Sequence, residues 1–390
     1  MKNFIFQNPT KLVFGKGQIA RLAELVPSDK KIMITFGGGS VKQNGVYTQV
    51  INALVNHDYI EFWGIEPNPK VETLRKAVAL CKENNVSFIL AVGGGSVLDG
   101  TKLIAAGALY ESDAWDIVLK GKADNSIPFA SVMTIPATGS EMNSGAVISR
   151  EETKEKYAFG GKYPEFSILD PEVTYSLSWK QTANALSDIF VHVIEQYMTT
   201  PGQSRVMDRW AEGILQTVLE IAPLIKQNPR DYDTMADFML SATMALNDFI
   251  QMGVTQDWTT HMIGHELTAL HGITHGSSLA IVLNGTLRVL KEQKKGKLLQ
   301  YGERIFGIVE GNDNERIDMA IAKTEEFFAS LGLSTRLSQE NIGTETIETI
   351  RNRFNDAGVT YGENHNVTGD IAKPILMACL CYHIHQKYFF

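Results

Sequence analysis

Short apolar runs alternate with amphipathic stretches through residues 1–180 of the chain. The runs are rich in β-branched and aromatic residues and end at Gly, Pro or Asp, as is typical of strands. Between two of them, residues 72–84 place their apolar side chains three and four positions apart, which predicts a helix with one buried face. The alternation therefore predicts β-α units that form a parallel sheet. The predicted strands are residues 31–36, 87–92, 131–135 and 166–169.

The pattern changes after about residue 176, where the β-branched runs fade. Residues 209–222 and 232–250 show helical periodicity with few helix breakers. Their apolar positions cover more than one narrow stripe, which indicates helices that are buried on most sides. We therefore expect an α/β domain over residues 1–178 and an all-α domain over residues 179–390.

Composition and charge exclude several classes of function. The 390 residues suit two or three domains, and 44 acidic against 36 basic side chains give a net charge of -8. This charge argues against nucleic-acid partners, which require a basic face. No apolar run reaches the roughly 18 residues of a membrane span, and the first residues lack the pattern of a signal peptide. We expect a cytoplasmic protein without a membrane partner, whose three cysteines are buried thiols.

Three loops carry candidate chemistry in the first half. Residues 37–40 and 93–96 both read Gly-Gly-Gly-Ser, follow a predicted strand and precede a helix, and residues 136–141 follow a third strand. Glycine lets backbone N–H groups approach an anion, and the next helix adds the positive end of its dipole. Each loop alone fits an ordinary β-α turn. Three of them at the carboxyl ends of parallel strands favour a dinucleotide site.

The first of these loops bears on the choice of cofactor. An acidic side chain after the strand that ends at Phe36 would bind a ribose 2'-hydroxyl and repel a 2'-phosphate. This position is occupied by Gly37 to Ser40, with Lys42 close behind. The loop therefore favours NADP(H).

Histidines cluster in the second half. Asp188 and His192 are four residues apart and so share one helix face. Residues 261–275 hold four of the nine histidines in an apolar context, where an imidazole needs a partner or a metal. One Asp with two or three His suits Fe²⁺ or Zn²⁺ better than Ca²⁺ or Mg²⁺. The HExxH motif of zinc proteases is absent, because Ala269 stands where its second His would be. A single His is more often a hydrogen-bonded core residue, which we expect of His57, His365, His383 and His385.

Taken together, these features resemble the iron-containing (group III) alcohol dehydrogenase family, in particular its NADPH-dependent aldehyde reductase and butanol dehydrogenase branch. The likeness runs nearly end to end, and its most specific parts are the Asp188/His192 pair and the histidine block. The other matching segments are residues 14–17, 37–40, 66–69, 93–96 with Asp99 and Lys102, 138–141 and 169–171.

The resemblance implies a Rossmann-like α/β N-terminal domain and an all-α C-terminal domain, the architecture of dehydroquinate synthase. It implies a cleft that holds one divalent metal, Fe²⁺ or Zn²⁺, beside the nicotinamide, and a homodimer. The implied metal ligands are Asp188, His192, His261 and His275, with His265 near the reacting oxygen as a proton relay and no role for His271. The implied cofactor-binding residues are Gly37, Gly38, Gly39, Ser40, Asn68, Gly94, Gly95, Ser96, Asp99, Thr138, Ser140, Asn143 and Lys156.

The resulting hypothesis is reversible hydride transfer between NADP(H) and a small alcohol/aldehyde pair. The apolar residues Trp258, Met262, Ile263 and Leu267 around the histidines favour short-chain aldehydes. Two alternatives remain. A lyase of the dehydroquinate-synthase type would want basic side chains around a phosphorylated substrate, and residues 261–275 contain no Lys or Arg. A non-enzymatic sensor could use the histidines as a structural metal site. Neither alternative would consume NADPH.

Overall fold

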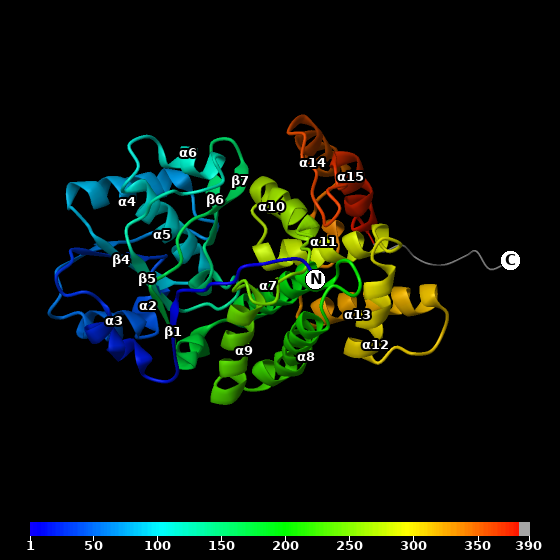
Figure 1. Ribbon diagram of the computed structural model, residues 1–390, viewed down its shortest axis with the longest axis horizontal. Coiled ribbons are helices and arrows are strands. Elements are labelled where there is room, and N and C mark those ends of the chain that lie inside the picture. The colour runs from blue at the N-terminus through cyan, green and yellow to red at the C-terminus, as the bar shows by residue number, and fades with distance from the viewer. Residues whose placement is uncertain (382–390) are drawn as a thin grey trace. The chain divides into compact units, whose positions relative to one another are not determined.

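The computed structural model describes residues 1–381 of the chain (Figure 1). Its contacts divide into two compact units. The α/β unit comprises residues 5–189 and 220–252, and the described part of the helical unit comprises residues 1–4, 190–219 and 253–381. Two helices, α7 (Trp179–Tyr197) and α8 (Arg205–Gln227), continue unbroken across the divisions. These units are discontinuous in sequence, and the domain boundary after residue 178 stays a prediction.

The α/β unit is built on a six-stranded sheet. All of its strands are parallel, in the order β1-β8-β5-β4-β2-β3. The four predicted strands are all present, so the parallel α/β sheet is confirmed. The strands are β1 (Lys11–Phe14), β2 (Ile32–Phe36), β3 (Tyr59–Phe62), β4 (Phe88–Gly93), β5 (Phe129–Met133) and β8 (Phe166–Leu169).

The two strands without a prediction, β1 and β3, are the edges of the sheet. Their side chains are mostly half-buried, whereas every residue of β2, β4, β5 and β8 is buried. An edge strand needs no continuous apolar run, and its sequence therefore lacks the signal of a buried parallel strand.

The strand order reverses between β2 and β4. The chain leaves β2 for β3 on one side, and it leaves β4 for β5 on the other. Phe36 pairs with Val92, so the loops that follow β2 and β4 start side by side. Open α/β sheets bind ligands at such a switch point, outside the carboxyl ends of the strands.

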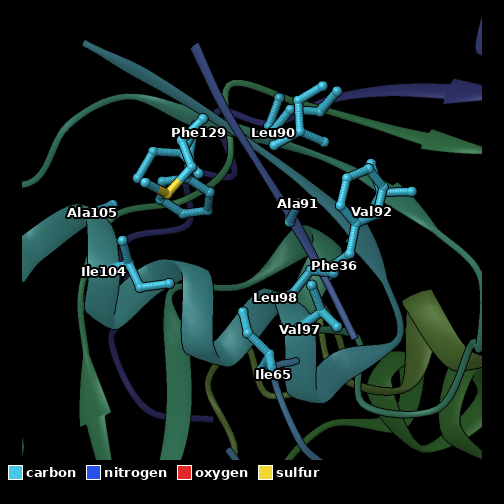
Figure 2. Close-up of a cluster of buried hydrophobic side chains, with 14 of the residues drawn as sticks. Phe36, Ile65, Leu90, Ala91, Val92, Val97, Leu98, Ile104, Ala105 and Phe129 are labelled. Atoms are coloured by element: carbon cyan, nitrogen blue, oxygen red, sulfur yellow. The ribbon is translucent and has the colours of Figure 1, made fainter. Parts of the chain in front are cut away.

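Helices and a hairpin complete the α/β unit. The hairpin consists of β6 (Gly145–Arg150) and β7 (Glu155–Gly160). Helix α5 (Gly95–Gly107) packs on β4 and β5, and Figure 2 shows its Val97, Leu98 and Ile104 among the side chains of the core. The remaining helices are η1 (Gln18–Arg21), α1 (Leu22–Leu25), α2 (Ser40–Gln43), α3 (Val46–Ala53), α4 (Val71–Glu83), α6 (Ala114–Leu119), η2 (Ser140–Met142), η3 (Pro171–Ser176) and α9 (Tyr232–Ala245).

The described residues of the helical unit form helices and one isolated bridge, between Tyr361 and Val367. Helix α10 (Thr259–His271) packs on α11 (His275–Val289), and α11 packs in turn on α13 (Asp313–Ser330) and α15 (Gly369–Ala378) (Figure 1). The others are α12 (Lys295–Phe306), η4 (Leu337–Glu340) and α14 (Thr344–Asp356). None of the helices in residues 1–381 is long and apolar enough to cross a membrane.

Three expectations need correction. The helix predicted over residues 232–250 ends at Ala245, shortly before Asp248 takes a left-handed backbone (φ 71°) that a helix cannot accommodate. Cys81 and Cys379 are buried thiols as expected, and burial raises the pKa of each to about 12, but Cys381 is exposed. His365 is also exposed rather than part of a core. His383 and His385 lie outside the described residues.

Candidate active site

Three helices carry the residues of the candidate metal centre. Asp188 and His192 lie one turn apart on α7, His261 and His265 one turn apart on α10, and His275 is the first residue of α11. The potential ligand atoms of Asp188, His261 and His275 lie within 4.8 Å of one another. The structure thus groups three of the four predicted ligands, although they are far apart in the sequence.

The remaining candidate histidines, His192, His265 and His271, differ in position. The ring of His192 stacks on that of His261, with centroids 4.6 Å apart, but His192 is not in the three-residue group and stays a predicted ligand. The buried ring of His265 lies 5.2 Å from that of His275. His271 is exposed, and its Nε2 hydrogen-bonds the hydroxyl of Thr346 at 2.9 Å. His265 therefore belongs to the cluster and His271 does not.

A buried ion cluster fixes the start of helix α10. Asp257 accepts the backbone N–H of Thr259 at 3.0 Å, so its side chain satisfies one of the free donors at the helix N-terminus. Its other oxygen binds the Nζ of Lys294 at 2.7 Å, and the same Nζ lies 3.1 Å from Glu363. All three charged side chains are almost fully buried. Breaking such a cluster by removing one partner is costly, so the position of His261 on α10 is well determined.

Glu195 is a site residue that the sequence analysis missed. It lies on α7, seven positions after Asp188 and three after His192, so all three share a helix face. Its buried carboxylate accepts the backbone N–H groups of Thr260 and His261, and it contacts Nδ1 of His261. The spacing on α7 is the signal that could have identified it.

Two of the residues expected to favour an apolar substrate have a different role. Ile263 and Leu267 are fully buried in a hydrophobic cluster with Val282 and Leu376, so they hold α10 in the core. Trp258, in contrast, lies beside the histidine cluster, with its ring centroid 5.3 Å from that of His261. It has a left-handed backbone (φ 64°), and strained conformations of this kind concentrate at functional sites.

The chemistry of the cluster fits the expected metal. A carboxylate and two imidazoles with mutually close donor atoms form a mixed oxygen and nitrogen set. Such a set is typical of Fe²⁺ and Zn²⁺ sites in proteins, whereas Mg²⁺ and Ca²⁺ prefer oxygen alone. The residues present can therefore hold one divalent ion of either kind.

The glycines of the first two loops lie at the switch point of the sheet, in different packing environments. Gly37 to Gly39 join β2 to α2, and a Cβ atom added at Gly38 would meet no atom within 4 Å. In the second loop Gly94 precedes α5 and Gly95 begins it. A Cβ atom at Gly95 would collide with the side chain of Thr138, so the second and third loops are closely packed.

A buried polar network ties the third loop to helix α5. Asp99 accepts the hydroxyl of Ser140 at 2.7 Å and the backbone N–H of Val147 at 2.9 Å. The ammonium of Lys102 donates to Ser140 at 2.8 Å and to Asn143 at 3.1 Å. Burial raises the pKa of Asp99 and lowers that of Lys102 to about 8. The network holds Ser140 and Asn143 in place.

Asn68 is held by hydrogen bonds to Ser96 and Lys156. The backbone N–H of Asn68 lies 3.3 Å from the hydroxyl of Ser96, and its side-chain oxygen accepts the Nζ of Lys156 at 2.9 Å. Burial lowers the pKa of Lys156 to about 8. The predicted cofactor residues therefore occupy the loops after β2, β3, β4 and β5, the first turns of α5, and β7. Their roles in binding stay predictions.

Comparison with known proteins identifies the family. A model described as iron-containing alcohol dehydrogenase matches residues 9–171, and the C-terminal model of the same family matches residues 182–377. The chain belongs to the iron-containing alcohol dehydrogenase family. The resemblance found in the sequence and the expectation of an oxidoreductase are thereby confirmed.

Among curated relatives, the NADPH-dependent aldehyde reductase YqhD of Escherichia coli is 50% identical over 97% of this chain and 100% of its own. A probable NADH-dependent butanol dehydrogenase of Bacillus subtilis is 41% identical, with the same coverage. Among solved structures, that of Escherichia coli YqhD has a TM-score of 0.95 at 49% identity and covers 97% of this chain and 99% of its own. NADH-dependent butanol dehydrogenase A of Thermotoga maritima has a TM-score of 0.93 at 34% identity, with 98% and 99% covered. The predicted fold class is confirmed.

Proposed function

We propose that this chain is a metal-dependent, NADP(H)-linked aldehyde reductase and alcohol dehydrogenase that acts on short-chain substrates. The observation that carries the proposal is the convergence of Asp188, His261 and His275 in a member of this family. Half of all aligned positions are identical to an NADPH-dependent aldehyde reductase, which supports the same chemistry. We also propose a cytoplasmic homodimer with the domain boundary after residue 178.

In this proposal Asp188, His192, His261 and His275 hold the divalent ion. When bound, the ion supplies Lewis-acid polarisation of the substrate oxygen, which is an electrostatic effect of several kcal/mol. His265, whose buried ring lies 5.2 Å from that of His275, would relay the proton that the reacting oxygen gains or loses. Trp258 excludes water from the histidines and favours an apolar substrate chain.

The loops of the α/β unit bind the dinucleotide. Backbone N–H groups of Gly94, Gly95 and Ser96 at the start of α5 would face its phosphates, supported by the helix dipole. The other cofactor residues are those of the first loop, Asn68, Asp99, Thr138, Ser140, Asn143 and Lys156. The first loop has no acidic side chain, which leaves room for a 2'-phosphate. The cation of Lys42 lies 4.0 Å from the ring of Trp63 and adds positive charge to this part of the unit.

The test is a spectrophotometric assay with butanal. We expect steady loss of NADPH absorbance, slower loss of NADH absorbance, and recovery of a chelated enzyme on addition of Fe²⁺ or Zn²⁺. Elemental analysis of protein purified without chelators would identify the resident metal. A lyase or a sensor would bind the dinucleotide but leave NADPH absorbance constant, and that result would exclude the proposal.

A further inference from the structure

The contacts of Glu195 reach further than those of an ordinary buried acid. Oε1 accepts the backbone N–H of Thr260 at 2.5 Å, and Oε2 accepts that of His261 at 3.1 Å while also contacting Nδ1 of the same residue. The side chain is 3% exposed. The backbone carbonyl of Glu195 also accepts the N–H of Asp257 at 2.8 Å. One residue of α7 thus fixes both the start of α10 and the ring of a candidate metal ligand.

The first of these effects is capping. Helix α10 is preceded by Trp258, whose side chain makes no capping hydrogen bond. The first N–H groups of a helix need acceptors, and a carboxylate near them also interacts favourably with the helix dipole. Glu195 supplies this acceptor from another helix. Capping alone would make Glu195 a purely structural residue.

The second effect concerns the ring of His261. An ionised carboxylate can only accept hydrogen bonds, so the hydrogen of the neutral imidazole must reside on Nδ1. The lone pair is then on Nε2, which is the nitrogen left for a cation. Metal-binding histidines commonly donate their second N–H to a carboxylate, which fixes the tautomer and the orientation of the ring.

We propose that Glu195 is a positioning residue for the metal centre, which selects the tautomer of His261 and thereby raises the affinity of the site for a divalent ion. The inference rests on the proposed metal-dependent function. It assigns to Glu195 no contact with substrate, cofactor or metal, and its effect is exerted through His261.

The experiment measures Zn²⁺ affinity of the metal-free full chain by competition with a chromophoric chelator. In Glu195→Gln one carboxylate oxygen becomes an NH₂ donor, so the amide cannot accept all three N–H groups that the carboxylate contacts. The amide can present either its oxygen or its NH₂ to Nδ1 of His261, so it no longer selects one tautomer. We expect Zn²⁺ to bind about 10- to 100-fold more weakly. The Co²⁺-substituted variant should also show an altered visible spectrum, which a loss of helix capping alone would not produce.

Glu212→Gln is the matched control. Glu212 is another buried glutamate of the helical unit, and it accepts hydrogen bonds from Tyr197, Arg209, Gln300 and Arg304 rather than from the clustered histidines. We expect this variant to lower the melting temperature of the metal-free protein and to leave Zn²⁺ affinity unchanged. Equal loss of affinity in both variants would overturn the inference, because general destabilisation would then explain it. Unchanged affinity in Glu195→Gln would also overturn it.

A second measurement applies if Glu195→Gln does not fold. Nitrogen NMR of histidine-labelled, metal-free wild-type protein should show His261 with its hydrogen on Nδ1, assigned by loss of the signal in His261→Gln. A hydrogen on Nε2 would overturn the inference. Failure of the wild-type protein to bind Zn²⁺ would instead remove the proposed metal centre, and the role of Glu195 with it.

Discussion

The cofactor loops of the α/β unit and the histidine cluster are organised on different principles. The loops follow neighbouring parallel strands, so the topology of the sheet brings them together whatever their side chains. The histidine cluster depends on side chains from α7, α10 and α11, each of which must present one particular residue. The loops should therefore tolerate substitutions that change the preference for NADPH over NADH, whereas single substitutions in the histidine cluster should abolish metal binding and turnover.

The sharpest test of this contrast is His261→Ala. We expect loss of bound metal and a fall in turnover of about a thousandfold or more, because Lewis-acid stabilisation contributes several kcal/mol. NADPH binding should remain measurable, since the loops belong to the other unit. Elemental analysis, kcat and NADPH fluorescence titration provide the three measurements.

His271→Ala is the control for this substitution. His271 lies on the same helix but is exposed and bonds Thr346, so metal content and turnover should stay close to those of the wild type. Full turnover by a His261→Ala protein without metal would contradict the proposed role of the cluster.

A substitution in the first loop should change which cofactor the enzyme prefers without abolishing its activity. In Gly38→Asp, a carboxylate would repel the 2'-phosphate of NADPH and accept the 2'-hydroxyl of NADH. We expect the ratio of kcat/KM for NADPH over NADH to fall about 10- to 100-fold, since repulsion between like charges costs a few kcal/mol. Gly38→Ala should leave the ratio unchanged, because a Cβ atom fits there freely. An unchanged ratio in the Asp variant would refute this account of the loop.

The smallest effect concerns the buried network of the third loop. Below pH about 8 the Lys102 ammonium is charged in both the folded and the unfolded chain, so the cost of burying its charge is fully present. Between about 8 and 10.5 the folded protein loses this proton while the unfolded chain keeps it, and folding is favoured as pH rises. The stability of the wild type relative to Lys102→Met should increase there by about 1 kcal/mol per pH unit.

Thermal unfolding of both proteins across this pH range measures the difference. Lys76→Met, at an exposed position of α4, serves as the reference for the loss of a lysine that is not buried. A difference between wild type and Lys102→Met that does not vary with pH would show that the ammonium of Lys102 is not held in an unfavourable environment.

The buried parts of the fold could be predicted because burial constrains the sequence. Strands β2, β4, β5 and β8 are buried on both faces and consist of apolar runs, whereas β1 and β3 at the edges leave no such signal. The predicted end of α9 was wrong because the apolar periodicity in the sequence continues to Ile250, past Asp248, whose left-handed backbone does not fit a helix.

The site was predictable to the extent that its signals are local. A glycine loop between a strand and a helix is visible in the sequence, and so is the i, i+4 pair of Asp188 and His192. The spacing on α7 places Glu195 on the same helix face as Asp188 and His192, but an acid on a helix is usually exposed, and the fold is what shows Glu195 buried against α10. Ile263 and Leu267 were misread for a related reason, since periodicity does not say whether an apolar side chain faces the core or a substrate.

The spare room around Gly38 has an evolutionary meaning. The corresponding glycines of the second loop, Gly93, Gly94 and Gly95, pack closely against Val97, Ile135 and Thr138. A larger residue at any of the three would therefore disturb folding before it could change cofactor binding. A change at Gly38 meets no such obstacle. Under the proposed function, one substitution at Gly38 would let a lineage change between NADPH and NADH without rebuilding the fold.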